Sequence, residues 1–184
     1  MGGWDNFLRF IGGSGEIVFK TILTFPREVT VPASTERFIA REKFVVDTSN
    51  TAEVKIAWMG DNFRLRFLGK IEEAQCEVTL LIHKLEEASV DGPTRTELGR
   101  DRIVTTLRCL FHLLSLQGNG QEGALLTNGY DYLFYVEVED EDEDHYPLAV
   151  RVCWCSVNGG WVVSAHSVED PNNWSVGGKV VPLK

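Results

Sequence analysis

The stretch YDYLFYVEVEDEDEDHYPLAVRVCWCSVNGGWVVSAHSV, residues 130–168, gives the clearest indication of fold in this chain of 184 residues. It contains three runs rich in β-branched and aromatic residues, at 130–138, 148–156 and 161–168, and such runs are typical of β-strands. Val157-Asn158-Gly159-Gly160 joins the last two, and Asn and Gly readily adopt the positive φ of a hairpin turn. We therefore predict an antiparallel meander, completed by a strand at 179–181.

Further strands are expected before this meander. The segments with strand-like composition are 16–25, 27–31, 38–46 and 54–58. Residues 74–85 fit two patterns, because their apolar residues both alternate, as in a strand, and recur along one helix face. We favour a strand there, since β-branched residues are frequent in the segment.

Two helices are predicted. Phe63, Phe67 and Ile71 recur at the four-residue spacing of a short helix. A long helix begins at the capping-box sequence Thr94-Arg95-Thr96-Glu97 and runs to about Gln117, before a Gly-Asn-Gly stop. The predicted fold class is α+β: a mostly antiparallel sheet packed against one long helix, plus a shorter helix and a C-terminal β-meander. The length suits a single globular domain over residues 1–184.

The acidity of the chain is local. The formal net charge is -9, and it becomes -2 when seven carboxylates near the predicted hairpin tip are left out. Those seven are Glu137, Glu139, Asp140, Glu141, Asp142, Glu143 and Asp144. A nucleic-acid-binding protein usually carries a basic stripe instead, so we expect no nucleic-acid partner.

The acidic tip has three interpretations. It is not an EF-hand, because a loop starting at Asp140 would need Gly and Glu where His145 and Arg151 stand. A solvated loop between two strands is the simplest interpretation. Binding of a basic protein partner and weak binding of divalent cations are the alternatives.

The four cysteines and the N-terminal sequence indicate a cytoplasmic protein with reduced thiols. MGGWDNFLRFIGGSGE lacks the long apolar run of a signal peptide, and no segment approaches the length of a transmembrane helix. Within residues 1–15, Trp4, Phe7, Leu8 and Ile11 have helical spacing ahead of a Gly-rich hinge. This segment either packs on the core or serves as an anchor for a partner or a membrane surface.

Cys153-Trp154-Cys155 suggests a soft-metal site. In a strand the two thiols point to the same face, two residues apart. If Gly159-Gly160 formed a two-residue turn, residue 153 would face His166 and supply a third ligand for zinc. No fourth ligand is evident, and two structural cysteines are the alternative. Ser164, His166 and Asp170 are residue types found in hydrolases, but the chain lacks a GxSxG elbow.

Three tryptophans in the C-terminal region, Trp154, Trp161 and Trp174, are a further candidate feature. Tryptophans of this kind pack in the core or line a groove that binds a peptide or a small ligand. The sequence leaves both alternatives open.

Several motifs resemble those of a group of short uncharacterised bacterial proteins that have no assigned function. The matching motifs are FVV at 44–46, WMGDNF at 58–63, FLGKIEE at 67–73, SVDGP at 89–93, ELG at 97–99, LLTNGYDYLFYV at 125–136, GGWVVSAHSVEDP at 159–171 and GGKVV at 177–181. The resemblance covers roughly residues 44–181 and transfers no catalytic residue. The CWC triplet, the acidic stretch and the VVPLK ending depart from the pattern.

These observations lead to one principal functional hypothesis and two alternatives. The principal hypothesis is a non-enzymatic binding or interaction module without a cofactor. The first alternative is a small metal-dependent or thiol enzyme that uses Cys153, Cys155 and His166, with zinc as the candidate metal. The second is an acidic inhibitor or immunity-type protein that binds a basic partner. The oligomeric state is not indicated by the sequence.

Overall fold

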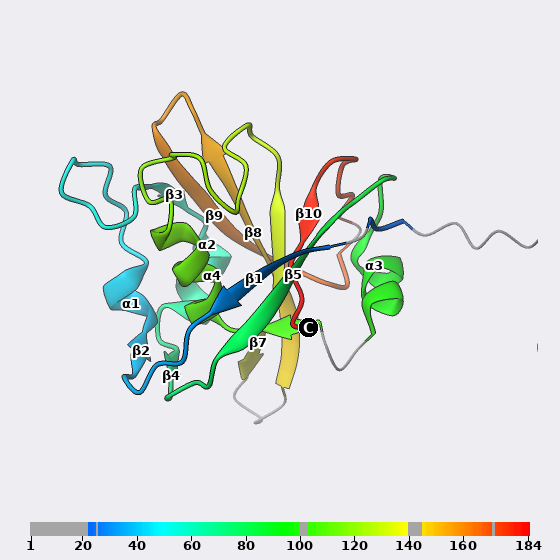
Figure 1. The fold of residues 1–184 in the computed structure, drawn as a ribbon, viewed down its shortest axis with the longest axis horizontal. Coiled ribbons are helices and arrows are strands. Elements are labelled where there is room, and N and C mark those ends of the chain that lie inside the picture. The colour runs from blue at the N-terminus through cyan, green and yellow to red at the C-terminus, as the bar shows by residue number, and fades with distance from the viewer. Residues whose placement is uncertain (1–21, 25, 100–102, 140–144, 171) are drawn as a thin grey trace, which may run out of the picture.

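The computed structural model describes residues 22–24, 26–99, 103–139, 145–170 and 172–184 (Figure 1). Eight strands of this described chain form one sheet, in the order β1-β5-β10-β7-β8-β9-β3, with β6 paired to β7 beside this path. A second sheet contains β2 and β4. The elements are β1 (Arg27–Val31), β2 (Phe38–Ile39), α1 (Ala40–Lys43), β3 (Ile56–Met59), α2 (Asp61–Phe67), β4 (Ile71–Glu72), β5 (Val78–Lys84), α3 (Asp91–Leu98), β6 (Val104–Thr105), α4 (Leu107–Ser115), β7 (Tyr132–Glu139), β8 (His145–Cys155), β9 (Gly160–Ser167) and β10 (Lys179–Val180).

The three central strands follow the sequence prediction. β7 pairs antiparallel with β8, and β8 pairs antiparallel with β9, over most of their length. All five residues from 132 to 136 are buried, which explains why YLFYV is apolar throughout instead of alternating with polar residues. The strands predicted at 27–31 and within 74–85 are also confirmed, as β1 and β5.

The predicted fold class is wrong, and the first error concerns strand direction. The large sheet is mixed, because β6 and β10 both pair parallel with β7, and β3 pairs parallel with β9. β10 therefore does not extend the meander; it inserts between β5 and β7. Hydrophobic patterns report which faces of a strand are buried, and they do not report which strand becomes its neighbour.

The second error concerns the long helix. The segment predicted as one helix divides into α3, the short strand β6 and α4. Gly99 ends α3 with a φ of 85°, a conformation that costs other residues energy. Thr106 then begins α4, because its side chain accepts a hydrogen bond from the backbone N–H of Cys109.

The predicted capping box is also not formed. α3 begins one turn earlier than expected, after Val90, and Thr94 lies inside the helix with its hydroxyl donating to the Val90 carbonyl over 3.0 Å. The carboxylate of Glu97 accepts hydrogen bonds from the distant backbone N–H groups of Ile22 and Leu23 instead. The predicted strand at 38–46 is similarly reduced to β2, followed directly by α1.

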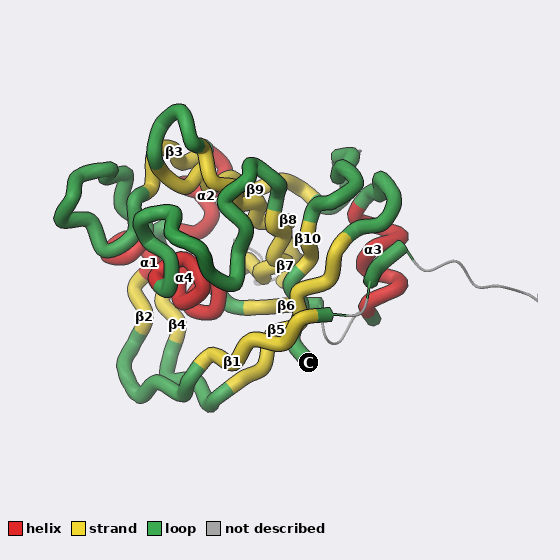
Figure 2. The backbone as a smooth tube through the Cα atoms, turned by 45° about the horizontal axis from the view of Figure 1, so that its top comes forward, coloured by secondary structure: helices red, strands yellow, loops and turns green. Residues whose placement is uncertain are grey.

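The core has two parts, on opposite faces of the large sheet. Phe134 and Val136 of β7 join the larger cluster, and Leu133 and Tyr135 join the smaller one. Because successive side chains of a strand point to opposite faces, the two clusters lie on either side of β7. Helices α1, α2 and α4 gather at one end of the molecule, whereas α3 stands apart at the other end (Figures 1 and 2). None of the helices in the described part of the chain has the length and apolar character that a membrane crossing requires.

Candidate functional site

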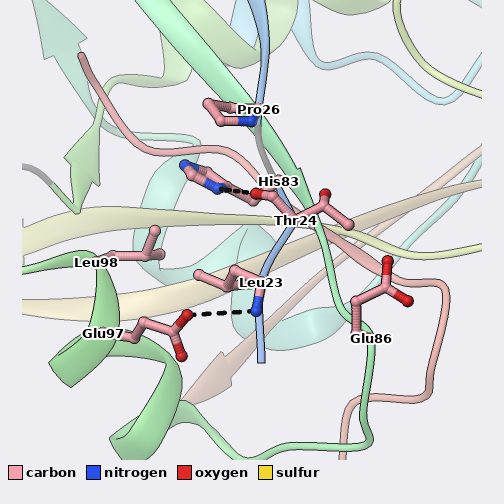
Figure 3. A pocket seen from close by; sticks show the side chains of 7 residues that line it. All are labelled: Leu23, Thr24, Pro26, His83, Glu86, Glu97 and Leu98. Carbon is pink, nitrogen blue, oxygen red and sulfur yellow. Dashed lines mark hydrogen bonds between the residues drawn. The ribbon is translucent and has the colours of Figure 1, made fainter. Parts of the chain in front are cut away.

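A largely apolar pocket with a volume of about 520 Å³ lies between α3, the end of β5 and the segment that leads into β1 (Figure 3). Pockets that bind small molecules typically have volumes of about 300–1,000 Å³. The described lining residues are Leu23, Thr24, Pro26, His83, Glu86, Glu97 and Leu98. Three stretches that are distant in sequence therefore meet around this pocket.

One wall of the pocket is held in place by Glu97 of α3. Its carboxylate accepts the backbone N–H of Ile22 over 3.1 Å and that of Leu23 over 3.3 Å. Leu23 also forms an isolated antiparallel bridge with Leu85, and its side chain is buried. The backbone N–H of Thr24 donates to the Lys84 carbonyl over 3.0 Å. Residues 23 and 24 therefore continue the antiparallel pairing of β1 with β5.

His83 supplies the imidazole of the pocket in a defined orientation. Its Nδ1 lies 3.0 Å from the backbone carbonyl oxygen of Thr24. A carbonyl oxygen can only accept, so Nδ1 carries a hydrogen. In the neutral tautomer with this hydrogen, Nε2 has none and can accept a hydrogen bond. Nε2 lies on the side of the ring away from Thr24 (Figure 3). Among the residues that the structure describes, none forms a hydrogen bond with Nε2.

Two carboxylates complete the polar part of the lining. Glu86 forms an ion pair with Lys84, with the Lys84 Nζ 3.0 Å from Oε1, and both side chains are partly open to solvent. Glu97 contributes the second carboxylate, at the opposite side of Leu23 from Glu86 (Figure 3). None of these lining residues is recognisable as part of a site from the sequence, because no motif or spacing connects residues 23, 83 and 97.

A buried hydrogen-bond network fixes the other end of α3. Asp91, the first residue of the helix, is 1% exposed. Its Oδ1 accepts hydrogen bonds from the Tyr135 hydroxyl over 2.6 Å and from the Trp174 indole N–H over 2.9 Å. Burial raises the pKa of Asp91, although both donors favour its ionised form. Burial, and then the nearby carboxylate, also raises the pKa of Tyr135.

Ser164 and His166 lie together on β9. The Ser164 Oγ is 3.0 Å from His166 Nε2, and burial lowers the pKa of His166. His166 and Asp170 line a small polar pocket of about 230 Å³, but Ser164 is 7% exposed and is not part of its described lining. Nucleophilic catalysis needs a nucleophile that the substrate reaches and a group that orients the base. Within the described residues, the Ser164–His166 pair lacks both.

The structure does not bring together the proposed metal ligands. The predicted register is wrong, because Cys153 pairs with Val162 and His166 pairs with Ala149. The reason is the turn between β8 and β9, which occupies residues 156–159 and therefore pairs Cys155 with Gly160. Within the described residues, no group of three His, Cys, Asp or Glu side chains is placed to hold a metal ion. All four cysteines are free, and burial raises the pKa of Cys153.

The three tryptophans do not line a common groove. Trp154 and Trp161 pack edge to face, with their ring centroids 5.4 Å apart, against the larger core cluster. Trp174 belongs to the smaller cluster, on the other face of the sheet. Trp161 and Trp174 are buried, and this agrees with the core alternative for these two residues.

The acidic stretch is described only in part. Glu137 is exposed on β7, and the backbone of Glu139 pairs with that of His145. The pairing of Glu139 with His145 places Glu137 and Glu139 on the end of β7 that leads into the connection with β8, as the sequence predicted. Residues 140–144 lie outside the described residues, as does the whole N-terminal segment 1–15 with Trp4, Phe7, Leu8 and Ile11.

Comparisons of the chain with protein-family models, with curated proteins and with solved structures found no match. The resemblance to short bacterial proteins therefore stays a prediction, and the geometry of the chain itself carries the functional argument.

Proposed function

We propose that this protein is a non-enzymatic binding module and that the pocket lined by Leu23, His83 and Leu98 is its ligand site. The observation that carries this proposal is the pocket itself, with apolar walls, a few oriented polar groups and a volume of about 520 Å³. This combination is typical of sites for small molecules. We also propose a cytoplasmic location, which the four free cysteines support.

The chemistry of the lining favours binding over catalysis. A nucleophilic enzyme would require a hydroxyl or thiol within reach of a base. In the described lining the hydroxyl is that of Thr24, which accepts the backbone N–H of Lys84 over 3.1 Å. The nearest imidazole, His83, uses Nδ1 to hold the Thr24 carbonyl and so acts as part of the wall.

Filling the pocket tests the proposal. Leu98 lies at the end of α3 and lines the pocket, so Leu98→Trp would place an indole ring in the space available to a ligand. Leu116→Trp is the matched control, because Leu116 is 51% exposed and follows α4. The probe is phenethyl alcohol, with binding followed by chemical shift changes of the His83 and Leu23 signals.

We expect phenethyl alcohol to shift these signals in the wild type and in Leu116→Trp, and not in Leu98→Trp. Thermal unfolding of both variants establishes that they fold. Unchanged binding by a folded Leu98→Trp protein, or no binding by the wild type at millimolar probe, would contradict the proposed site.

A further inference from the structure

Beyond the proposed ligand site, we infer that a second pocket binds a small carboxylate ligand through the guanidinium group of Arg108. This pocket has a volume of about 190 Å³ and lies between α4, the end of α1 and the chain that follows β1. Helices α1 and α4 lie at the opposite end of the fold from α3 (Figure 1). The inference therefore does not depend on the site beside α3.

The apolar walls of the second pocket would receive the body of the ligand. Phe38 and Phe111 line it, together with Val31 and Pro32. The rings of Phe38 and Phe111 pack with their centroids 5.9 Å apart, and both side chains are buried. Aromatic walls favour a flat apolar body. Because the volume is below the range of about 300–1,000 Å³ that is usual for ligand pockets, the ligand should be small.

Arg108 brings a positive charge to this pocket in a fixed orientation. It lines the pocket and is 9% exposed, with its Cζ 5.7 Å from the centre of the Phe38 ring. Its Nη2 donates to the backbone carbonyls of Glu36 over 2.6 Å, Glu72 over 3.3 Å and Glu73 over 3.0 Å. These contacts hold the guanidinium group in place before a ligand binds.

The guanidinium group has no counter-ion among the described residues. Arg108 forms no ion pair with any of their carboxylates. The carboxylate of Glu72 instead accepts the backbone N–H groups of Leu107 and Arg108, each over 2.8 Å. A largely buried charge without a counter-ion is costly, and a carboxylate ligand would supply the missing charge.

One nitrogen of the guanidinium group is left for the ligand. Nη2 is occupied by the three carbonyls, and Nε is fully buried without a hydrogen bond. Nη1 forms no hydrogen bond with the described residues and, unlike Nε, is not fully buried. It is therefore the donor that a ligand in the pocket would reach. Hydrogen bonds between a guanidinium and a carboxylate are among the strong ones in proteins.

The other charged groups of the lining do not offset the charge of Arg108. Lys43 and Glu53 pair with each other, with the Lys43 Nζ 3.2 Å from Oε2 of Glu53. Burial lowers the pKa of His112, so its imidazole is neutral near pH 7. Within the described lining, one positive charge without a partner remains. It attracts a carboxylate and repels an ammonium group.

Three probes with one ring and different charge test the inference: benzoate, benzamide and benzylamine. We expect benzoate to bind about five- to tenfold more tightly than benzamide, because hydrogen bonds between charged groups are stronger. Benzylamine should bind most weakly. Dissociation constants come from titrations followed on the backbone amide signals of Ser34 and Phe111, which both line the pocket.

Two variants locate the bound benzoate. Ala33 is exposed and lines the pocket, so Ala33→Trp fills the space without replacing a core side chain, and it should abolish binding. Thr35→Trp is the matched control, because Thr35 is exposed and is not part of the described lining. Leu98→Trp, which fills the pocket beside α3, should leave benzoate binding unchanged.

Arg108→Gln tests the charge itself. We expect it to bring the affinities for benzoate and benzamide close together, with thermal unfolding establishing that it folds. Arg37→Gln is the control for a loss of charge elsewhere, because Arg37 is exposed, pairs with Glu73 and is not part of the described lining. It should retain the preference for benzoate.

The outcomes separate this inference from the proposed function. Equal affinity for benzoate and benzamide in the wild type, or no benzoate binding at millimolar concentration, would overturn the carboxylate site. Benzoate binding that persists in a folded Ala33→Trp protein would also overturn it, as would binding that is lost in Leu98→Trp. If Arg108→Gln does not fold, the Ala33→Trp result decides. The response of the Leu23 and His83 signals to phenethyl alcohol tests the other pocket separately.

Discussion

The buried carboxyl group of Asp91 gives the sharpest test of how α3 is held. The Tyr135 hydroxyl donates to Asp91 Oδ1 over 2.6 Å, and Tyr135→Phe removes this donor while preserving the ring. A hydrogen bond to a charged group contributes about 1.5–3 kcal/mol, against about 0.5–1.5 kcal/mol for a bond between neutral groups. We therefore expect Tyr135→Phe to lower the free energy of unfolding by about 1.5–3 kcal/mol where Asp91 is ionised. In an Asp91→Asn background the same change should cost about 0.5–1.5 kcal/mol.

The same network predicts how stability depends on pH. Burial raises the pKa of Asp91 in the folded state above that of the unfolded chain, which is about 3.9 for an ordinary Asp. The folded state thus favours the neutral carboxyl, whose stabilising contribution is present below pH 4 and is lost as pH rises through the folded-state pKa. Asp91→Asn does not titrate, so it should gain stability relative to the wild type as pH rises. The Tyr135 hydroxyl favours the ionised carboxylate, so Tyr135→Phe should raise the pKa of Asp91 further. The decline of the free energy of unfolding with rising pH should therefore continue to a higher pH in this variant than in the wild type.

Urea unfolding followed by far-UV circular dichroism, at intervals between pH 4 and 8, measures both effects. Tyr146→Phe is the control, because Tyr146 is half-buried and its hydroxyl has no hydrogen bond among the described residues. We expect that control to change stability by less than about 0.5 kcal/mol. If Tyr135→Phe lowers the free energy of unfolding equally in both backgrounds, or if the pH profile of Asp91→Asn parallels that of the wild type, then a charged hydrogen bond at Asp91 does not hold α3.

Two further predictions concern the loop between α4 and β7. Gly120→Ala should cost about 1–3 kcal/mol more than Gly129→Ala, since a Cβ at Gly120 would lie 2.2 Å from the Trp154 ring. Both glycines have positive φ, and Gly129 has no atom within 4 Å of its Cβ position, so equal costs in urea unfolding would exclude a steric cause. Gln117→Leu should cost about 1–3 kcal/mol for each backbone group of Leu125 left unpaired, because the buried amide binds the Leu125 N–H over 2.8 Å and its carbonyl over 2.7 Å. Faster hydrogen exchange at the Leu125 amide would accompany the loss, and unchanged protection there would contradict it.

Strands that pair with their neighbours in the sequence were predicted correctly from their composition. The prediction of strand pairing was wrong where a strand pairs with a segment distant in the sequence. β7, β8 and β9 are consecutive, so a turn and two apolar runs were enough to place them side by side. β10 follows β9 in the chain, yet it pairs with β5 and β7 on the far side of the meander. No local pattern distinguishes a strand that extends a meander from one that crosses over it.

The candidate site was missed for a related physical reason. No motif or spacing links His83 to Glu97. Their roles depend on a segment 59 residues before His83 and 75 residues before Glu97. Glu97 was interpreted from its neighbours as half of a capping box. In the fold its carboxylate binds the backbone of residues 22 and 23, and that contact has no counterpart in the spacing of the sequence.

The two ends of α3 explain why this pocket has a defined shape. Asp91 ties the start of the helix to Tyr135 of β7 and to Trp174, and Glu97 ties its end to the segment that leads into β1. α3 itself has little apolar surface, with Asp91 and Thr94 as its buried residues, so packing alone would not fix its position. Polar contacts are directional, and they hold the helix at a set distance from β5 without filling the space between them. Leu98 packs against the smaller core cluster and also lines this open volume, so a ligand that entered the volume would gain apolar burial that the fold itself leaves unused.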